Sequence, residues 1–246
     1  MKLRYFFSDF DGTLTERGEI SKHLLDLLED LKKKKITFVL VSGRSASWGH
    51  FFLTHFPISY AVMEAGGVVL HKDHDKKRNK INMQVLATQI QLKKLEKISL
   101  NLHHLLPELE MAVDNTGRIT DRAIELDSLK NPKFLKSVQQ FLLEHRCHYS
   151  VSNVHLNFSN IKNNKWSGVS FLCENVLKKK IDTIQAQSCF FGDAPNDEIM
   201  FKHFEHSVGV ANILPYLNSM EHHPSHIAKK SEIKGVLQFL KDAAIL

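Results

Sequence analysis

The stretch "LRYFFSDFDGTLTERG", residues 3–18, decides the fold of this 246-residue chain. Its apolar run from Leu3 to Phe7 has the length and aromatic content of a short buried strand. The run ends at two aspartates, Asp9 and Asp11, which are separated by one residue and followed by a glycine. Two carboxylates this close repel each other unless a cation or hydrogen-bond donors offset the repulsion. Because open α/β sheets bind ligands beyond the carboxyl ends of their strands, the stretch predicts a site at that edge.

The composition describes a globular protein. With 246 residues and 43% hydrophobic content, the chain can bury a sizeable core in one large domain or two unequal ones. No apolar run reaches the roughly 18 residues that a membrane-spanning helix needs, and the first residues lack the pattern of a signal peptide. We therefore expect a cytoplasmic location and no membrane partner.

The charge distribution bears on nucleic-acid binding, and the cysteine pattern bears on zinc binding. The net charge is +6, but lysines gather at residues 32–35 and 178–180, near the ends of predicted helices. The helix dipole favours cations there, so we expect solvated helix ends and no nucleic-acid partner. The three cysteines, Cys147, Cys173 and Cys189, form no zinc-binding pattern, and we expect reduced structural thiols.

A strand–helix–strand pattern follows the opening stretch. Leucines at helical spacing occur within residues 21–35, and the β-rich apolar run 36–41 ends at Ser42, Gly43 and Arg44. Such a unit implies a right-handed crossover and a parallel sheet. The Ser42 hydroxyl, the Gly43 amide and the Arg44 guanidinium are donors that suit an anion, although a plain loop would have the same residues.

A strongly polar segment at residues 71–80 marks a change of pattern. After it the sequence predicts a different set of elements: helices at about 84–105 and 131–146, and strands at about 109–114 and 148–158. Two helices with antiparallel strands make a small α+β layer. We therefore divide the chain into a core segment at 1–76, an inserted α+β cap at 77–159, and a second core segment at 160–246.

The parallel pattern resumes after the insertion. A helix opens near Lys165, and the apolar strand at 189–191 leads to Asp193, with Asn196 and Asp197 in the next turn. The expected fold class is therefore α/β, with a Rossmann-like parallel-sheet core and an inserted α+β cap domain.

The predicted sheet gathers these polar residues at one edge, where they can do chemistry that each alone could not. An Asp-x-Asp-Gly sequence by itself can be an ordinary turn. Several carboxylates with room for water and phosphate suit Mg²⁺, and the lack of Cys or His ligands argues against zinc. The set fits phosphoryl transfer through an aspartyl phosphate, with one aspartate attacking phosphorus and a second one moving protons.

The sequences "DFDGTLT", "VSGR", "NNK" and "GDAPND", in this order, resemble the four motifs of the haloacid dehalogenase superfamily of phosphatases. The resemblance implies that Asp9 is the nucleophile and Asp11 the general acid/base. It implies that Ser42, Gly43 and Lys165 bind the phosphoryl group. It also implies a magnesium site made by Asp9, Asp11 and Asp193, with Asn196 and Asp197 in support.

The position of the insertion, between the second and third motifs, resembles the subclass with a large α+β cap. That subclass includes sucrose-, trehalose- and mannosylglycerate-phosphate phosphatases and Cof-like sugar phosphatases. It implies a Mg²⁺-dependent phosphatase acting on a small phosphorylated metabolite, with a sugar phosphate as the first candidate. We predict Arg44 and Arg122 as substrate contacts. The chain departs from many relatives in having Ala65 and Gly66 where they have Asn-Gly, and Trp166 after the lysine.

Two other functions stay open at this point. A phosphomannomutase-like sugar phosphotransferase would resemble this subclass and share "DGTLT", but tends to differ from "SGR". A non-catalytic binding protein on the same fold would not need the complete set of chemical residues that this chain has.

Overall fold

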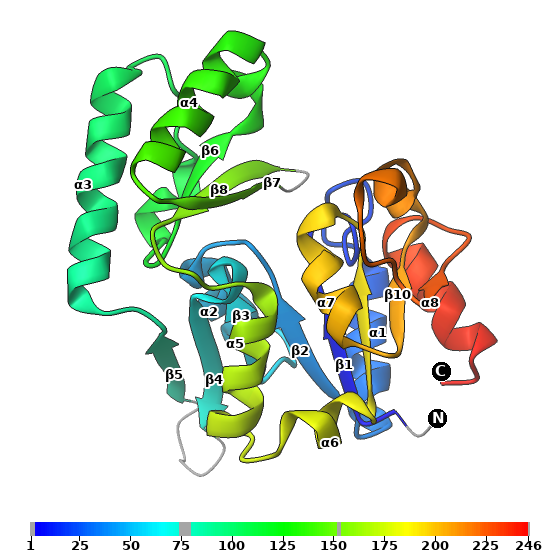
Figure 1. Cartoon of the computed structure of the whole chain (residues 1–246). Helices are drawn as coiled ribbons and strands as arrows, with labels where there is room; N and C mark the ends of the chain where they lie inside the picture. The colour runs from blue at the N-terminus through cyan, green and yellow to red at the C-terminus, as the bar shows by residue number, and fades with distance from the viewer. Residues whose placement is uncertain (1–2, 74–79, 152–153, 246) are drawn as a thin grey trace.

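The computed structural model describes residues 3–73, 80–151 and 154–245. Figure 1 shows a large unit built around one long sheet and a smaller unit that stands over one end of it. The smaller unit, residues 89–159, is called the inserted unit below, and the remainder is called the core unit. No helix in these described ranges has both the length and the apolar character needed to cross a membrane.

The core unit contains an eight-stranded sheet with the order β11-β10-β9-β1-β2-β3-β4-β5. Neighbours are parallel from β11 to β3, whereas β4 and β5 are antiparallel additions. The strands are β1 (Tyr5–Ser8), β2 (Thr37–Val41), β3 (Tyr60–Met63), β4 (Val68–Asp73), β5 (Lys80–Val85), β9 (Ser188–Gly192), β10 (Ser207–Gly209) and β11 (His226–Ile227). Strand β1 lies between β2 and β9, with Ser8 paired with Leu40 and Phe191.

The central strands are apolar on both faces because helices cover both faces of the sheet. Phe6 packs into one core and stacks on Phe191, with ring centroids 4.5 Å apart. Phe7 points to the opposite core together with Phe190. This alternation explains why the opening run is continuously apolar and not half polar.

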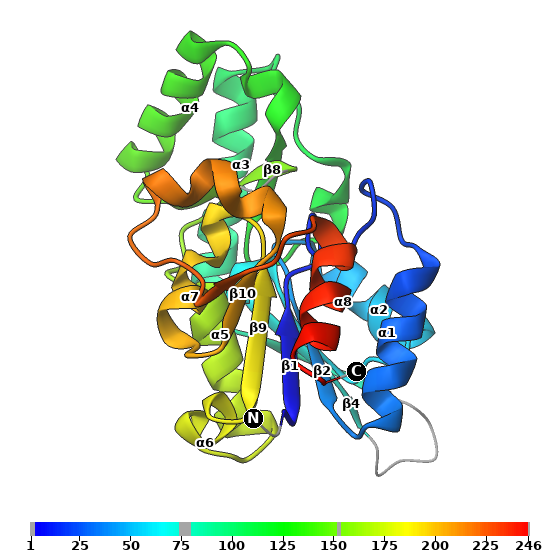
Figure 2. The ribbon, with the colours of Figure 1, turned by 90° about the vertical axis from the view of Figure 1, so that its right-hand side faces the viewer.

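Two sets of helices cover the sheet, as Figures 1 and 2 show. One face carries α1 (Lys22–Lys33), α2 (Ala46–His55) and α8 (Glu232–Asp242). The other face carries α5 (Lys165–Phe171), α6 (Ile181–Gln185) and α7 (Glu198–His203). Short 3₁₀ or π turns complete the chain: Glu64–Gly66, Val113–Gly117, Leu126–Leu129, Leu172–Val176, Pro195–Asp197 and Ala211–Ser219.

The inserted unit has its own small sheet and its own core. Its antiparallel strands lie in the order β6 (Arg122–Glu125), β8 (His155–Ser159) and β7 (His148–Val151). Helices α3 (Gln89–Leu105) and α4 (Pro132–Glu144) pack on one face through a separate apolar cluster that includes Leu95, Leu142 and Phe158. Helix α3 begins with a capping box between Thr88 and Gln91.

The predicted α/β class with a parallel-sheet core is confirmed. Three predicted elements differ from the structure. Residues 80–85, which the sequence placed in the cap, form β5 at the edge of the core sheet, and the first cap helix begins only at Gln89. The strand predicted at 109–114 is reduced to one bridge between Met111 and Ile124. The strand predicted at 148–158 is two strands, β7 and β8. The division at 77–159 stays a prediction.

Candidate active site

The ends of three neighbouring strands carry the predicted site residues. Asp9 follows β1, Ser42 follows β2 and Asp193 follows β9. These strands are adjacent and parallel, so the three residues leave the sheet at the same edge. Lys165, the first residue of α5, reaches the same place from the next layer.

Lys165 joins two of the aspartates. Its Nζ lies 2.8 Å from Asp9 Oδ1 and 2.6 Å from Asp197 Oδ1, and its side chain is only 2% exposed. A buried ammonium is stable only with such partners, and these carboxylates raise the Lys165 pKa although burial alone lowers it. The other oxygen of Asp197 accepts the backbone N–H groups of Asp193 and Ala194, at 2.9 and 3.3 Å. Asp197 therefore fixes the lysine and the loop after β9 together.

The aspartates form a compact acidic group. Asp9, Asp193 and Asp197 place carboxylate oxygens within 4.8 Å of one another. Burial is the largest cause that raises the pKa of Asp9 to about 7 and of Asp193 to about 8, and neighbouring carboxylates add to both shifts. Thr13 and Asn212 each donate a 2.8 Å hydrogen bond to Asp193. Three carboxylates therefore face one lysine, a balance that favours binding a cation.

The donor set fits Mg²⁺. The available ligands are hard oxygens, as this ion prefers, and no histidine or cysteine belongs to the acidic group found among the described residues. Asn196 Oδ1 is buried and has no hydrogen-bond partner within the described ranges. Asn196 also lines the same pocket as Asp9. A bound cation or its water shell would satisfy this oxygen.

Asp11 is held separately from this group. Arg44 donates from Nε and Nη2 to the two Asp11 oxygens, both at 2.7 Å. This hydrogen bonding is the largest cause that raises the Arg44 pKa. Gly12 follows Asp11 with a φ of 78°, a conformation that favours glycine, and it turns the chain directly after Asp11. Arg44, predicted as a substrate contact, thus orients Asp11.

The loop after β2 is fixed from both units. Ser42 N donates to Val62 O at 2.8 Å, and Ser42 Oγ accepts a 3.1 Å hydrogen bond from Arg44 N. The Gly43 carbonyl accepts hydrogen bonds from Arg118 and Asn157, each at 2.9 Å. Both donors come from the inserted unit, which therefore lies directly against the predicted phosphate-binding loop.

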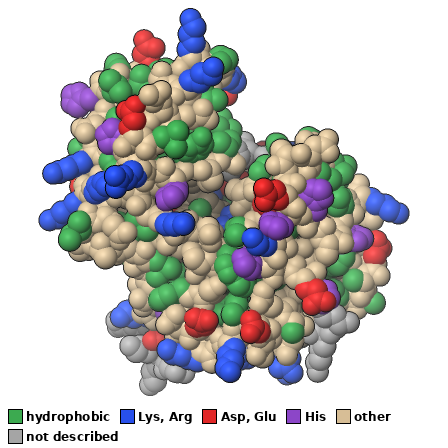
Figure 3. Space-filling view, in the orientation of Figure 1, with side chains coloured by type: hydrophobic (Ala, Val, Ile, Leu, Met, Phe, Trp, Pro, Cys, Tyr) green, Lys and Arg blue, Asp and Glu red, His purple; other side chains and the backbone are tan. Residues whose placement is uncertain are grey.

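Two adjoining pockets lie between the units, where Figure 3 shows the surface hollowed. The smaller pocket includes Asp9, Asp11 and Ser42, and strand β8 covers it with His155 and Asn157. The larger one, a space of about 770 Å³ open to solvent, is lined by both units. Its polar lining includes Thr120, His148, Ser150, Asn157, Ser159, Asn163, Lys165 and Asn196. Asn157 and Asn196 line both pockets, so the two pockets share part of their lining.

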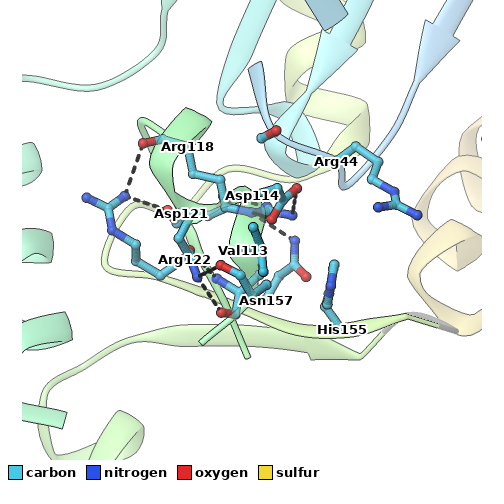
Figure 4. Close-up of polar contacts among 12 residues, drawn as sticks. Arg44, Val113, Asp114, Arg118, Asp121, Arg122, His155 and Asn157 are labelled. Carbon is cyan, nitrogen blue, oxygen red and sulfur yellow. Dashed lines mark hydrogen bonds and ion pairs between the residues drawn. The ribbon is translucent and has the colours of Figure 1, made fainter. Parts of the chain in front are cut away.

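The structure does not bring Arg122 to these pockets. Its Nη1 donates to the backbone oxygens of Asp121 and Arg118, at 2.7 and 3.4 Å. Figure 4 shows its guanidinium pointing away from Arg44 and His155. Arg122 therefore lies outside both pockets, and its role as a substrate contact stays a prediction.

Two residues of β8 were missed by the sequence interpretation. His155 and Asn157 line the pocket of the aspartates, whereas the alternate residues Leu156 and Phe158 face the core of the inserted unit. This alternation in "HLNFS" was the available sign that one face of the strand is polar. Burial lowers the His155 pKa, although the nearby Glu125 carboxylate opposes the shift.

Solved structures of other proteins share the fold described above. The structure superposes on a protein of Thermoplasma acidophilum, 0175, with a TM-score of 0.77, 18% identity and 100% coverage of both chains. It is similar to the sucrose-phosphatase of Synechocystis in complex with sucrose and phosphate, with a TM-score of 0.66, 16% identity and 98% coverage of both chains. It is also similar to a trehalose-6-phosphate phosphatase related protein, with a TM-score of 0.62, 17% identity and 98% coverage of both chains.

At these identities the superpositions establish the fold alone. No match was found among curated protein sequences. The family model described as haloacid dehalogenase-like hydrolase matches residues 6–138 and 112–240, which confirms the resemblance drawn from the four motifs. Because these matches cover well over half of its length, the chain belongs to the family of haloacid dehalogenase-like hydrolases.

Proposed function

We propose that this hydrolase is a Mg²⁺-dependent phosphatase that releases phosphate from a small phosphorylated metabolite, with Asp9 as the nucleophile. The observation that carries the proposal is the buried Asp9 carboxylate, held 2.8 Å from Lys165 in a pocket shared with Asp11 and Ser42. A carboxylate oriented by an ammonium and open to a pocket suits attack on phosphorus.

In the proposed reaction Asp9 attacks phosphorus and forms an aspartyl phosphate while the leaving alcohol departs. Lys165 offsets the charge of the phosphoryl oxygens, and Ser42 donates a hydrogen bond to one of them. Asp11 gives a proton to the leaving oxygen and then takes one from the water that hydrolyses the intermediate. Arg44 binds both oxygens of the Asp11 carboxylate, which is the form that takes the proton from water in the second step. In the first step Asp11 carries a proton, so one of these two contacts must be released.

The metal would be held by Asp9, Asp193 and the backbone carbonyl of Asp11, with Asn196 and Asp197 in support. When bound, Mg²⁺ supplies positive charge that favours the negatively charged phosphoryl group. Thr13 and Asn212 hold Asp193 in place for this purpose, each through a 2.8 Å hydrogen bond. They are the supporting contacts whose loss would loosen the site.

The two pockets support a proposal for the substrate class. We place the phosphate in the smaller pocket and the leaving group in the larger one, whose wall combines apolar surface with hydroxyl and amide side chains that suit the hydroxyl groups of a sugar. The structurally similar sucrose-phosphatase was solved with sucrose and phosphate, which supports a sugar phosphate as the first candidate. A cytoplasmic location and the lack of a nucleic-acid partner stay predictions.

The first test is the Asp9→Asn variant. It should lose phosphate release from every substrate in a panel of phosphorylated metabolites with MgCl₂, because an amide cannot act as the nucleophile. Circular dichroism and thermal unfolding would verify that the variant is folded. Retained turnover in a folded Asp9→Asn protein would refute covalent catalysis at Asp9.

The same panel decides between the remaining functions. A hexose phosphate that is converted into an isomer without free phosphate would identify a phosphotransferase. Failure of the wild-type protein to release phosphate from any member of the panel would favour the non-catalytic binding protein.

A further inference from the structure

A buried charged cluster lies where the inserted unit meets the core unit. Arg118 is its centre, and its side chain is 0% exposed. Asp114 binds Arg118 Nε and Nη2 at 2.9 and 3.0 Å, and Asp121 binds Nη1 at 2.9 and 3.0 Å. Figure 4 shows Arg118 grouped with these carboxylates and Asn157. A guanidinium that is fully buried and held on two sides has one fixed orientation.

The same Nη1 that binds Asp121 also reaches the core unit. It donates to the Gly43 carbonyl at 2.9 Å, across a sequence separation of 75 residues. Asn157 Nδ2 donates to the same carbonyl at 2.9 Å and to Asp121 Oδ2 at 3.0 Å. Two side chains of the inserted unit, tied to each other through Asp121, therefore hold one backbone oxygen of the predicted phosphate-binding loop.

Holding this oxygen also fixes the peptide that follows it. The peptide group is planar and trans, so the Gly43 C=O and the Arg44 N–H point in opposite directions. The Arg44 N–H donates to Ser42 Oγ at 3.1 Å. Since Ser42 Oγ accepts this hydrogen bond, its own proton is left to be donated elsewhere. Under the proposed function that proton goes to a phosphate oxygen.

The backbone beside Arg118 is attached to the core unit independently. The Glu64 carboxylate, at the end of β3, accepts hydrogen bonds from Ile119 N, Thr120 N and Thr120 Oγ1 at 2.6 to 3.0 Å. It also accepts one from Ala46 N at 2.9 Å, just beyond the loop. Glu64 thus places the segment that carries Arg118 at a set distance from residues 42–46.

We propose that Arg118 is a positioning residue that orients the Ser42 hydroxyl for phosphate through the Gly43–Arg44 peptide. It touches neither the substrate pocket around Asp9 nor any of the acidic metal-binding candidates. The proposal rests on the proposed function only in taking phosphate as the ligand of this loop. Because Arg118 belongs to the inserted unit, the loop keeps this geometry only while the two units are docked.

A double-mutant cycle tests the connection. Isothermal titration with inorganic phosphate in MgCl₂ would be performed on the wild type, Arg118→Lys, Ser42→Ala and the double variant. Lysine keeps the charge but cannot bind Asp114, Asp121 and Gly43 together. We expect each single variant to weaken phosphate binding about fivefold, the worth of one hydrogen bond. The double variant should bind about as weakly as Ser42→Ala alone, because both changes remove the same interaction.

A matched control separates positioning from stability. Val138→Ala removes buried volume from the core of the inserted unit, far from the loop, so it should lower the melting temperature and leave phosphate affinity unchanged. If Arg118→Lys does not fold, Asn157→Ala takes its place in the cycle, because it removes the other donor to Gly43. If Asn157 contacts phosphate directly, the losses of phosphate affinity caused by Asn157→Ala and Ser42→Ala should multiply in the double variant.

The possible outcomes are distinct. Wild-type phosphate affinity in Arg118→Lys, or losses that multiply in the double variant, would overturn the positioning proposal. A wild type that binds no phosphate would overturn it together with the proposed function. A wild type that binds phosphate but hydrolyses no ester would refute only the proposed function, and the cycle would still decide on Arg118.

Discussion

At the scale of single residues, the site depends on one buried cation. Lys165 is the only lysine or arginine that contacts Asp9 or Asp197 in the described ranges, and both contacts are shorter than 3 Å. The ion pairs of Lys165 are buried, whereas lysines on the surface are solvated by water. Lys33, for example, pairs with Asp30 at 3.1 Å, but its side chain is 71% exposed.

We expect Lys165→Met to lower the free energy of unfolding by about 3–5 kcal/mol at pH 8, because it leaves buried carboxylates without their partner. Urea unfolding in EDTA would measure the change. Adding MgCl₂ should restore part of the loss, since a bound cation compensates the same charges. Lys33→Met is the matched control and should leave the unfolding curve in place, because exposed ion pairs contribute little. A Lys165→Met curve that coincides with the wild type would show that the buried pairs are not needed for the fold.

At the scale of elements, the start of helix α5 packs closely against Gly66, in the turn after β3. Gly66 has a φ of 103°, and a Cβ built there would lie 1.9 Å from the Asn164 backbone oxygen. Asn164 caps α5 immediately before Lys165. Gly66 thus lets the turn after β3 approach the helix end that presents the lysine. Where many relatives have Asn-Gly, this chain has Ala65 and Gly66. The asparagine is therefore replaced, whereas the glycine that this close packing requires is present.

Gly66→Ala should therefore destabilise the protein and also impair phosphate release. Its positive φ and the backbone overlap together should cost more than about 2 kcal/mol. Gly18→Ala provides the control, because Gly18 has a φ of 78° with nothing within 4 Å of the added Cβ. That variant should lose only the cost of the backbone conformation, about 1 kcal/mol, and keep its activity. Equal unfolding free energies for the two variants would mean that α5 can shift away without cost.

The limits of prediction from sequence also belong to the element scale. Asp9, Ser42 and Asp193 were found because each follows a strongly apolar strand, a pattern that is visible locally. Residues Lys80–Val85 alternate polar and apolar side chains as a strand does, but the strongly polar segment before them was interpreted as the exit from the core, so this edge strand was assigned to the cap. The contacts from Arg118 and Asn157 to Gly43 span 75 and 114 residues, and no local pattern encodes such pairings.

At the scale of the whole molecule, the acidic group couples metal binding, protonation and stability. Burial and mutual repulsion raise the pKa values of Asp9 and Asp193 to about 7 and 8 in the metal-free protein, against 3.8 for an unperturbed aspartate. The folded metal-free state therefore binds more protons than the unfolded state between about pH 4 and 8. Its stability should fall as pH rises through this window, because the unfolded carboxylates ionise more easily.

Magnesium should reverse this trend, because the ion binds carboxylates and not carboxylic acids. The stabilisation by MgCl₂, measured as the rise in melting temperature over EDTA, should be small at pH 6 and grow towards pH 8. Titration calorimetry in two buffers of different ionisation enthalpy should detect protons released on binding at pH 7. Asp193→Asn should abolish most of the magnesium effect and weaken the pH dependence of the metal-free protein, because it removes one of the raised carboxyls. A magnesium stabilisation that is equal at pH 6 and pH 8, with no proton release, would mean that the aspartates are already ionised and that other contacts compensate their repulsion.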